Sequence, residues 1–339
     1  MKPGIFRAAV VGLGGVSSMH IKSLEAIGIA ITAVCDNKPE QAKAAGDSLK
    51  CAFYTCYEEM LASGGFEVVH ICLPHYLHAP VAIAALNKNY HVVCEKPMAT
   101  TVADAEDMIS AAETNAARLE IIFQNRFNQG SKLIKTALDS GELGQVTGGS
   151  LRVTWHRNQN YYTQSDWRGR WATEGGGALI NQSIHTFDLV NYFLGAPKSV
   201  NASIANRAHP YIEVEDVAEG IIEYNNAAIS FFVNTYHPYD APVSLELVCE
   251  KGRAVIHGED TTMFYKDGRE VTASKDEDTP LLKGKDYWGN SHVSQIKNFY
   301  DSLTGKPVEV VCGTEGIRTQ RLINGIYDSA KFGQTIYLQ

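Results

Sequence analysis

The sequence lacks any cysteine pattern typical of a metal centre or a redox pair. Its cysteines are odd in number, no two of them have C-x-x-C spacing, and most lie within apolar runs. They are Cys35, Cys51, Cys56, Cys72, Cys94, Cys249 and Cys312. Thiols in such settings are usually reduced and buried. We therefore expect no zinc site, no other bound metal and no redox-active cysteine pair.

The sequence also lacks long apolar segments and dense basic segments. No apolar stretch is long enough to span a membrane, and Met1-Lys2-Pro3-Gly4 leads into a strand without a signal-peptide pattern. The formal net charge is -8, and no Lys/Arg block of the kind that binds nucleic acid is present. Internal repeats and low-complexity segments are absent as well. These absences predict a soluble cytoplasmic protein that binds neither nucleic acid nor a membrane.

What is present is ordinary globular composition and enough length for two domains. The chain has 339 residues, of which 45% are hydrophobic and 20% charged, and each half can form its own core. The pattern changes near Gln124-Asn125-Arg126. Before this point short apolar runs alternate with helix-like segments, and after it long strands and turns predominate. We predict one domain over residues 1–124 and a second over residues 125–339, whose last helix can pack back on the first.

The alternation in the first domain predicts parallel βαβ units with right-handed crossovers, and hence a doubly wound sheet. The predicted strands are Arg7 to Val11, Ile29 to Cys35, Val68 to Leu73, Tyr90 to Cys94 and Leu119 to Phe123. Helices are expected from about residue 16 and at about residues 39–49, 57–63, 79–87 and 102–115.

A glycine-rich segment, Gly12-Leu13-Gly14-Gly15-Val16-Ser17, joins the first predicted strand to the first helix. Gly12 permits a tight turn, and Gly14 lets the backbone approach a pyrophosphate, which the N–H groups at the helix start would hold. Ser17 stands where glycine or alanine is usual, and its small side chain still permits close packing of helix and strand. Strand, loop and helix together predict a dinucleotide site.

Asp36 indicates which dinucleotide is preferred. It lies 24 residues after Gly12, at the end of the second predicted strand. Its carboxylate can accept hydrogen bonds from the adenine-ribose hydroxyls, and it would repel a 2′-phosphate. The following residues, Asn37-Lys38, do not place an arginine immediately after it. NAD is therefore favoured over NADP.

Glu95-Lys96-Pro97 follows the apolar run that ends at Cys94. Open α/β sheets bind ligands beyond the carboxyl ends of their strands, which would place Lys96 beside a reacting group. Pro97 fixes its own φ and restricts Lys96 to extended conformations, so the direction of the lysine is partly preset. The alternative is a surface salt bridge between Glu95 and Lys96. The dinucleotide loop upstream favours the active-site interpretation.

The second domain has features of an antiparallel sheet with helices gathered on one side. Ile229, Phe231 and Val233 alternate with their neighbours, and Asn225-Asn226 and Asp267-Gly268 are typical of hairpin turns. Aromatic residues occur on both faces of this strand. The aromatic residues on the outer face suggest that another subunit covers it. We therefore expect a homo-oligomer, either a dimer or a tetramer, formed through the sheet.

One helix of the second domain carries polar residues suited to chemistry. It is expected from about Ala178 to Leu194, after a flexible entry at Gly175-Gly176-Gly177. Asn181 and His185 are four residues apart and share a face of an α-helix. Asp188, three residues further on, could orient the imidazole. A single histidine on such a helix is often a core residue, but the nearby asparagine and the dinucleotide loop favour a functional role.

These motifs, in this order, resemble the Gfo/Idh/MocA family, the glucose-fructose oxidoreductase and inositol dehydrogenase group. The matching segments are Gly12 to Ser17, Pro74-His75-Tyr76-Leu77-His78, Glu95-Lys96-Pro97, Asn125-Arg126-Phe127, Trp167-Arg168, Gly175 to Asp188 and Gly325 to Ala330. The resemblance covers nearly the whole chain. It implies an N-terminal Rossmann domain and a C-terminal α+β domain with an open-faced, mainly antiparallel sheet.

The resemblance also implies roles for individual residues. Lys96, whose bond to Pro97 is commonly cis in the family, would bind cofactor and substrate, and His185 would be the acid/base. Asn181 occupies a position where the family usually has an aspartate, and an amide cannot accept a proton. The expected catalytic residues are therefore Lys96 and His185, with Asn181 as a hydrogen-bonding partner.

The expected contact residues are more numerous. Cofactor contacts are expected from Gly12, Gly14, Gly15, Val16, Asp36, Asn37, Leu73, Pro74, His75, His78, Glu95, Lys96 and Asn125. Substrate contacts are expected from Lys96, His156, Tyr161, Tyr162, Trp167, Arg168, Asn181, His185 and His292. The two tyrosines could instead serve packing, and His75 and His78 are expected to shape the cofactor loop rather than bind a metal.

Together these features predict an oxidoreductase that transfers a hydride between NAD(H) and a secondary alcohol or ketone carbon of a sugar, a sugar derivative or a cyclitol. His185 would take the hydroxyl proton, and Lys96 would stabilise the alkoxide. Two alternatives remain. One is an NAD-dependent glycosidase that acts through transient oxidation, and the other is a non-catalytic NAD-binding regulator. Retention of both Lys96 and His185 disfavours the regulator.

Overall fold

The computed structural model describes residues 6–273 and 291–338 of the chain. Met1 to Gly4, considered above for a signal peptide, lie outside the described residues. The chain forms two compact units, of which the first contains residues up to Gln124 together with Ser291–Ile317 and the second contains the remainder. The sequence had assigned residues 291–317 to the second domain. In the structure they join the first unit because α10 (His292–Leu303) contributes apolar side chains to its core.

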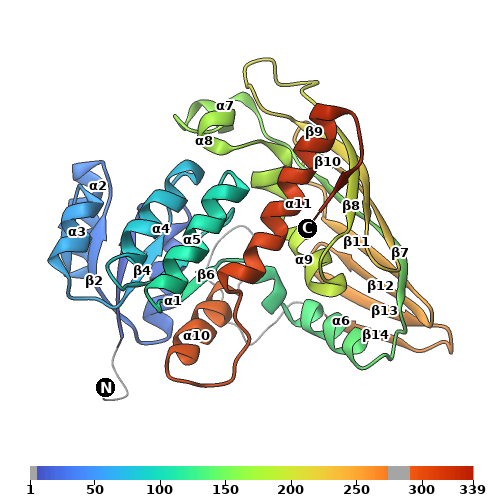
Figure 1. Cartoon of the computed structure of the whole chain (residues 1–339), viewed down its shortest axis with the longest axis horizontal. Coiled ribbons are helices and arrows are strands. Elements are labelled where there is room, and N and C mark those ends of the chain that lie inside the picture. Colours follow the sequence, from blue (N-terminus) through green and yellow to red (C-terminus); the bar gives the residue numbers. More distant parts are fainter. Residues whose placement is uncertain (1–5, 274–290, 339) are drawn as a thin grey trace. The chain divides into compact units, whose positions relative to one another are not determined.

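The first unit is built on a parallel six-stranded sheet, which confirms the predicted Rossmann-type fold (Figure 1). The strand order is β3-β2-β1-β4-β5-β6, so sequence order reverses between the neighbouring strands β1 and β4. The strands are β1 (Arg7–Val11), β2 (Ala30–Cys35), β3 (Ala52–Tyr54), β4 (Val68–Ile71), β5 (His91–Cys94) and β6 (Leu119–Ile121). Strand β3 was not predicted, because it has only three residues and its side chains are exposed or half-buried.

Helices connect these strands, as the alternating pattern predicted. They are α1 (Ser17–Ala26), α2 (Pro39–Leu49), α3 (Tyr57–Ser63), α4 (His78–Leu86) and α5 (Val102–Thr114). The start of α5 is capped by the Thr101 hydroxyl, which accepts a hydrogen bond from the Asp104 N–H. Helix α1 packs against α10, and α4 packs against α5. Two short 3-10 turns, His75–Leu77 and Gln124–Phe127, follow β4 and β6.

Helix α10 is held in the first unit by both apolar and polar contacts. Ile296 and Phe299 belong to a buried core together with Val10, Val34 and other strand residues. On the same helix, the Gln295 amide donates to the carbonyl oxygen of Ile121 at 2.8 Å. A helix distant in sequence is therefore an integral part of the Rossmann core.

The second unit contains a nine-stranded sheet, and only the β7–β10 pair in it is parallel among the paired strands of the described residues. The order is β14-β13-β12-β11-β7-β10-β9-β8-β15. The strands are β7 (Val146–Thr154), β8 (Ser199–Ala205), β9 (Val217–Glu223), β10 (Ala228–Asn234), β11 (Ser244–Cys249), β12 (Gly252–His257), β13 (Asp260–Tyr265), β14 (Glu270–Ala273) and β15 (Ile336–Tyr337). Both predicted hairpins, at Asn225-Asn226 and Asp267-Gly268, are confirmed.

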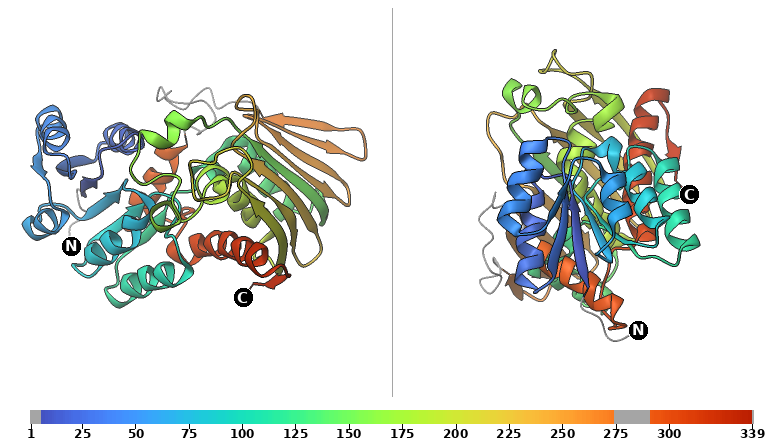
Figure 2. Two further views of the ribbon diagram at one scale, coloured as in Figure 1. Left: turned by 90° about the horizontal axis from the view of Figure 1, so that it is seen from above. Right: turned by 90° about the vertical axis from the view of Figure 1, so that its left-hand side faces the viewer.

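The two faces of this sheet differ, as the alternating pattern predicted. Ile229, Phe231 and Val233 are buried, and the Phe231 ring packs edge-on against Phe187 of α9 (Ile184–Leu194). The opposite face carries Ile221 and Val248, which are 49% and 46% exposed. Figure 2 shows the strands of this sheet side by side, with α9 against one face. One face therefore supports the core of the unit, and the other is open.

Besides α9, the second unit contains one longer helix, α6, and several short helical segments. They are α6 (Gln129–Asp139), α7 (Gln159–Thr163), α8 (Trp171–Glu174) and a π-helical turn, Ala178–Ser183, directly before α9. Helix α11 (Gly313–Phe332) begins in the first unit and ends in the second. Across residues 6–273 and 291–338, we find no helix with the length and hydropathy needed to cross a membrane.

The packing of α10 leads to a stability prediction. Replacing the fully buried Phe299 with alanine should lower the free energy of unfolding of the first unit by about 3 to 5 kcal/mol, because a large cavity remains. Urea denaturation followed by circular dichroism measures this change. Phe332→Ala, at a position that is 58% exposed, is the matched control and should change stability little. Equal midpoints for the two variants would contradict the assignment of α10 to the core.

Candidate active site

The glycine loop lies between β1 and α1 and has the shape that a phosphate group needs. Gly12 has φ +85°, and a Cβ atom there would lie 2.5 Å from the carbonyl oxygen of Cys72, so only glycine fits. A Cβ atom at Gly14 or Gly15 would meet nothing within 4 Å. The Ser17 hydroxyl donates to the Gly14 carbonyl at 2.7 Å. The loop is therefore tight against β4 and open on its other side, at the start of α1.

Asp36 lies at the end of β2, beside this loop. Its Oδ2 accepts a hydrogen bond from the Leu13 N–H at 2.8 Å, and its Oδ1 accepts from the Lys38 N–H at 2.9 Å. These two contacts hold the carboxylate in a fixed orientation next to the glycine loop. Each oxygen keeps further acceptor capacity, which suits ribose hydroxyls.

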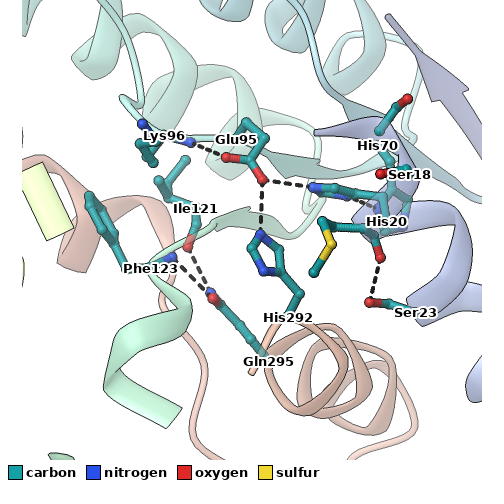
Figure 3. Close-up of polar contacts among 12 residues, drawn as sticks. Ser18, His20, Ser23, His70, Glu95, Lys96, Ile121, Phe123, His292 and Gln295 are labelled. Atoms are coloured by element: carbon teal, nitrogen blue, oxygen red, sulfur yellow. Dashed lines mark hydrogen bonds and ion pairs between the residues drawn. The ribbon is translucent and has the colours of Figure 1, made fainter. Parts of the chain in front are cut away.

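The loop after β5 carries Glu95 and Lys96 (Figure 3), followed by Pro97. The Lys96–Pro97 bond is cis. All three residues are buried. The backbone N–H of Lys96 donates to Oε2 of Glu95 at 3.2 Å. The surface salt bridge considered from the sequence is therefore excluded.

Glu95 receives two further donors from side chains. Its Oε1 lies 2.9 Å from Nε2 of His20 in α1 and 3.3 Å from Nε2 of His292 in α10. Burial by itself would raise the pKa of Glu95, but the hydrogen bonds from His20 and His292 outweigh it and hold the pKa well below the usual carboxyl value. His292, which the sequence suggested for substrate contact, is instead buried against Glu95.

His78 connects the loops that follow β4 and β5. Its ring is fully buried, with Nδ1 2.6 Å from the carbonyl oxygen of Pro97 and Nε2 2.8 Å from that of Leu73. His75 begins the 3-10 turn after Pro74 and is also buried. His78 therefore holds the two loops at the carboxyl edge of the sheet together.

In the second unit, the triple glycine is closely packed and not the flexible entry expected from the sequence. A Cβ atom at Gly176 would clash with the Tyr327 hydroxyl, and one at Gly177 would lie 2.2 Å from the Glu215 carbonyl oxygen. The buried Glu215 carboxylate accepts hydrogen bonds from the N–H groups of Gly177 and Leu179. Burial raises the pKa of Glu215 to about 7. The glycines thus permit close backbone contact.

Asn181 lies in the π-helical turn, whereas His185 lies in α9, which begins at Ile184. The expectation that a spacing of four residues places them on one face applies to an α-helix, so it does not apply to this pair. Its amide nitrogen donates to Oε1 of Glu174 and, at 3.3 Å, to the Tyr161 hydroxyl. Gln182 donates to the same hydroxyl at 2.8 Å. Glu174 is 1% exposed. Glu174 and Gln182 were not predicted as site residues, although Glu174 directly precedes the motif and Gln182 lies within it.

His185 is half-buried in the first turn of α9. Asp188 does not take the orienting role that its spacing suggested. Both of its oxygens accept hydrogen bonds from the Arg126 guanidinium at 2.7 Å, and Oδ1 also accepts from Thr319 at 2.9 Å. Arg126 and Asp188 are both buried, so this bidentate ion pair fixes α9 to the segment after β6.

The other predicted substrate residues of the second unit fall into two groups. Tyr162 is buried, its hydroxyl lies 3.3 Å from the Thr235 hydroxyl, and burial raises its pKa, so it serves packing. The Tyr161 ring lies 4.2 Å below the Arg168 guanidinium, which also contacts the Trp167 ring at 5.3 Å. The His156 side chain is exposed, and the backbone N–H of His156 donates to Oδ1 of Asp240 at 2.7 Å. Asn125 lies in the 3-10 turn after β6.

The predicted residues therefore form one group in each unit. The first unit holds the glycine loop, Asp36 and the Lys96 loop, and the second holds Asn181, His185 and the Tyr161–Arg168 group. Among the described residues, His20, Glu95 and His292 have ligand atoms close enough for a metal ion, with all three atoms within 4.8 Å of one another.

Comparison with known proteins gives matches over both units. Residues 6–123 match the model of the oxidoreductase family with an NAD-binding Rossmann fold, and residues 132–255 match the GFO/IDH/MocA C-terminal domain. Inositol 2-dehydrogenase of Salmonella typhimurium is 28% identical over 310 residues, and the match covers 88% of this chain and 85% of that protein. D-glucoside 3-dehydrogenase of Escherichia coli is 26% identical over 358 residues, covering 98% and 97%.

A solved structure extends this similarity. The WlbA dehydrogenase from Bordetella pertussis, in complex with NADH and UDP-GlcNAcA, is 30% identical with a TM-score of 0.86, and the match covers 99% of each chain. Levoglucosan dehydrogenase, in complex with NADH and levoglucosan, is 18% identical with a TM-score of 0.86 and supports the fold alone.

The position of Asp36 leads to a prediction about cofactor choice. Asp36→Ala should weaken NADH binding about tenfold, or about 1.4 kcal/mol, because ribose hydroxyls lose their acceptor. NADPH binding should not weaken, since the charge facing its 2′-phosphate is removed. Fluorescence titration of both cofactors measures this, and Asp47→Ala on the exposed side of α2 is the control. An equal loss for both cofactors would contradict a role in cofactor choice.

Proposed function

The chain belongs to the GFO/IDH/MocA oxidoreductase family, and we propose that it transfers a hydride between NAD and a secondary alcohol carbon of a sugar, a sugar derivative or a cyclitol. It is an NAD-dependent dehydrogenase that acts on CH–OH groups. The observation that supports the finer proposal is the buried Glu95–Lys96 pair at the carboxyl end of β5. Strand β5 neighbours β4, where the strand order reverses and where such folds bind their ligands.

The residues of the first unit fit NAD. The open side of Gly14 and Gly15 leaves space for the pyrophosphate, the start of α1 offers N–H groups to it, and Asp36 offers acceptors to the ribose. When bound, NAD supplies the redox chemistry by exchanging a hydride with the substrate carbon. Leu73, Pro74 and the Lys96 loop would contact the cofactor from the neighbouring strand ends.

Proton transfer falls to the protein. As the hydride leaves, the substrate hydroxyl must lose a proton, and we assign His185 as the acceptor because the nitrogen of a neutral imidazole can accept a proton and histidine is the commonest general base. The Lys96 ammonium stabilises the negative charge that develops on the substrate oxygen. In the reverse direction His185 returns the proton to the carbonyl oxygen.

Asn181 positions the substrate in this proposal. Its amide nitrogen is directed at Glu174 and Tyr161, so its orientation is set by protein groups. An amide cannot accept a proton at neutral pH, so Asn181 can hydrogen-bond a substrate hydroxyl but cannot replace His185. The adjoining Arg168, which is stacked on the Tyr161 ring, offers a cation, which suits a sugar with polar or anionic substituents.

A substrate panel tests the activity. We would assay NADH formation with myo-inositol, methyl glucosides and UDP-GlcNAcA, which represent the kinds of compound in the names of the relatives, and measure the reverse reaction with the matching ketones. Turnover of at least one is expected. Cleavage of a glycoside without net NADH formation would favour the glycosidase alternative. NADH binding without turnover of any compound would favour the regulator.

Two substitutions test the proposed proton transfer. Lys96→Met and His185→Ala should each lower kcat about 100-fold or more, because general acid–base and electrostatic catalysis contribute effects of this size. NADH affinity should stay within a few-fold of the wild type. His257→Ala, at an exposed position of β12, is the control. A normal kcat for either variant would remove that residue from the mechanism.

The seven free cysteines fit the reducing cytoplasm, which we propose as the location of the protein.

We propose further that a second copy of the chain covers the open face of the nine-stranded sheet, which carries Ile221 and Val248. Multi-angle light scattering should give at least twice the chain mass of 37.1 kDa. Ile221→Lys combined with Val248→Lys should lower that mass without unfolding the chain. A monomeric wild type would contradict the proposal.

A further inference from the structure

A row of hydrogen-bonded side chains starts at Glu95 and continues through His20, all within the first unit (Figure 3). Oε1 of Glu95 is 2.9 Å from Nε2 of His20, Nδ1 of His20 is 2.9 Å from Nδ1 of His70, and Nε2 of His70 is 3.0 Å from the Tyr300 hydroxyl. His292 adds a second donor to Glu95 at 3.3 Å. We call these five residues the Glu95 network.

The members of the network are buried to an unusual degree for polar side chains. His20 and His70 are 0% exposed, His292 is 1%, Glu95 is 4% and Tyr300 is 5%. They come from α1, β4, α10 and the loop after β5. Buried polar groups are costly unless they are hydrogen-bonded, and here each member is hydrogen-bonded to at least one other.

The bonding pattern fixes the direction in which each proton is donated. The Glu95 carboxylate accepts from the Lys96 backbone N–H at Oε2 and from two imidazoles at Oε1, so Nε2 of His20 and Nε2 of His292 carry protons. A neutral His20 ring then has a bare Nδ1, and Nδ1 of His70 must donate to it.

The proton positions of His70 and Tyr300 follow in the same way. Because Nδ1 of His70 carries the proton of a neutral ring, its Nε2 is bare and accepts from the Tyr300 hydroxyl. All donors in the row therefore point towards Glu95. A carboxylate with several aligned donors is stabilised in its charged form.

The charge states agree with this direction. Burial lowers the pKa of His20 and lowers that of His70 well below its usual value, so both rings are neutral near pH 7. Burial raises the pKa of Tyr300 well above its usual value, so its hydroxyl keeps the proton that it donates.

We propose that His20, His70, Tyr300 and His292 are positioning residues, which hold Glu95 anionic in one orientation and through it fix Lys96 at the carboxyl edge of the sheet. This inference rests on the proposed function in one respect, namely that Lys96 is a catalytic residue. The link to Lys96 is its backbone N–H, which donates to the oxygen of Glu95 that the imidazoles do not use.

Several other groups surround Glu95 and bear on its titration. The ionisable side chains that face it are His20 from α1, Cys72 at the end of β4, His78 from α4, Cys94 from β5, and His292 from α10. Lys96 adjoins it in the chain. Burial raises the pKa values of the Cys72 and Cys94 thiols well above the usual value for cysteine, so neither thiol adds a negative charge near pH 7.

The direction of donation can be observed by NMR on the full chain with ¹⁵N-labelled histidine. We expect His20 with its proton on Nε2, His70 with its proton on Nδ1, and no titration of either ring between about pH 6 and 9. Single variants of each histidine assign the signals. The opposite tautomers, or a charged ring at either position, would overturn the proposal.

The same spectra decide between the network and a metal site, since His20, Glu95 and His292 have the donor types that zinc prefers. A zinc ion would need Nε2 of both imidazoles without protons. With the network as proposed, zinc chloride leaves the His20 and His292 signals unchanged. Stoichiometric binding that shifts both signals would overturn the proposal.

Two substitutions of His20 form a matched pair. In His20→Gln the amide nitrogen occupies the place of Nε2 and can still donate to Glu95, whereas the shorter His20→Asn reaches only the place of Nδ1. With the substrate from the panel, His20→Asn should lower kcat about tenfold, the loss expected for one hydrogen bond to a charged group, and leave KM for NAD unchanged. His20→Gln should keep most of kcat. Equal kcat losses in the two variants would contradict the positioning role.

Thermal melting as a function of pH gives a test that needs no activity. Because the folded-state pKa of Glu95 is depressed, its contribution to stability is present above the ordinary carboxyl pKa and is lost as the pH falls. His20→Asn should therefore have a lower Tm than His20→Gln at pH 7, and the gap should narrow only below the ordinary carboxyl pKa, as the pH falls from about 4.5 towards about 2. A gap that is equal at both pH values would indicate packing alone and refute the proposal.

These results are separable from those on the proposed function. NMR and melting report on the network even in the absence of turnover. Normal turnover in Lys96→Met would refute the role of Lys96 while leaving the tautomers as measured.

Discussion

The arrangement of the first unit depends on burying one carboxylate, that of Glu95, at the carboxyl end of β5. A buried anion is tolerable only where donors converge on it. Here the donors come from α1, α10 and the backbone of the next residue. This requirement explains why α10, which is distant in sequence, belongs to the Rossmann core, and why its first residue is a histidine and not an apolar residue.

Much of the fold follows from local patterns. Apolar runs that end in Gly12, Asp36 and Glu95 marked three of the parallel strands, since parallel strands are buried on both faces and end where polar residues begin. Strand β3 escaped detection because it is short and mostly exposed. The placement of α10 could not be predicted, because its apolar side chains fit either domain and only tertiary packing selects one.

The sequence supplied candidate residues for the site but not the contacts that these residues make. The motifs identified Lys96, Asn181 and His185, but spacing alone suggested that Asp188 would serve His185, whereas Arg126 binds it. An ion pair between residues 62 positions apart leaves no local signal. The π-helical turn was missed for a similar reason. It arises where Gly176 and Gly177 pack against Tyr327 and Glu215, and these contacts are non-local.

The parallel pairing of β7 with β10, in the middle of an otherwise antiparallel sheet, has a consequence for the order of folding. Hairpins such as β9–β10 and β11–β12 can form early because their strands are adjacent in sequence. The β7–β10 pair must close a loop that contains the π-helical turn and α9. Asn181 and His185 lie within this loop, so we expect the geometry proposed for them to form only after the local hairpins.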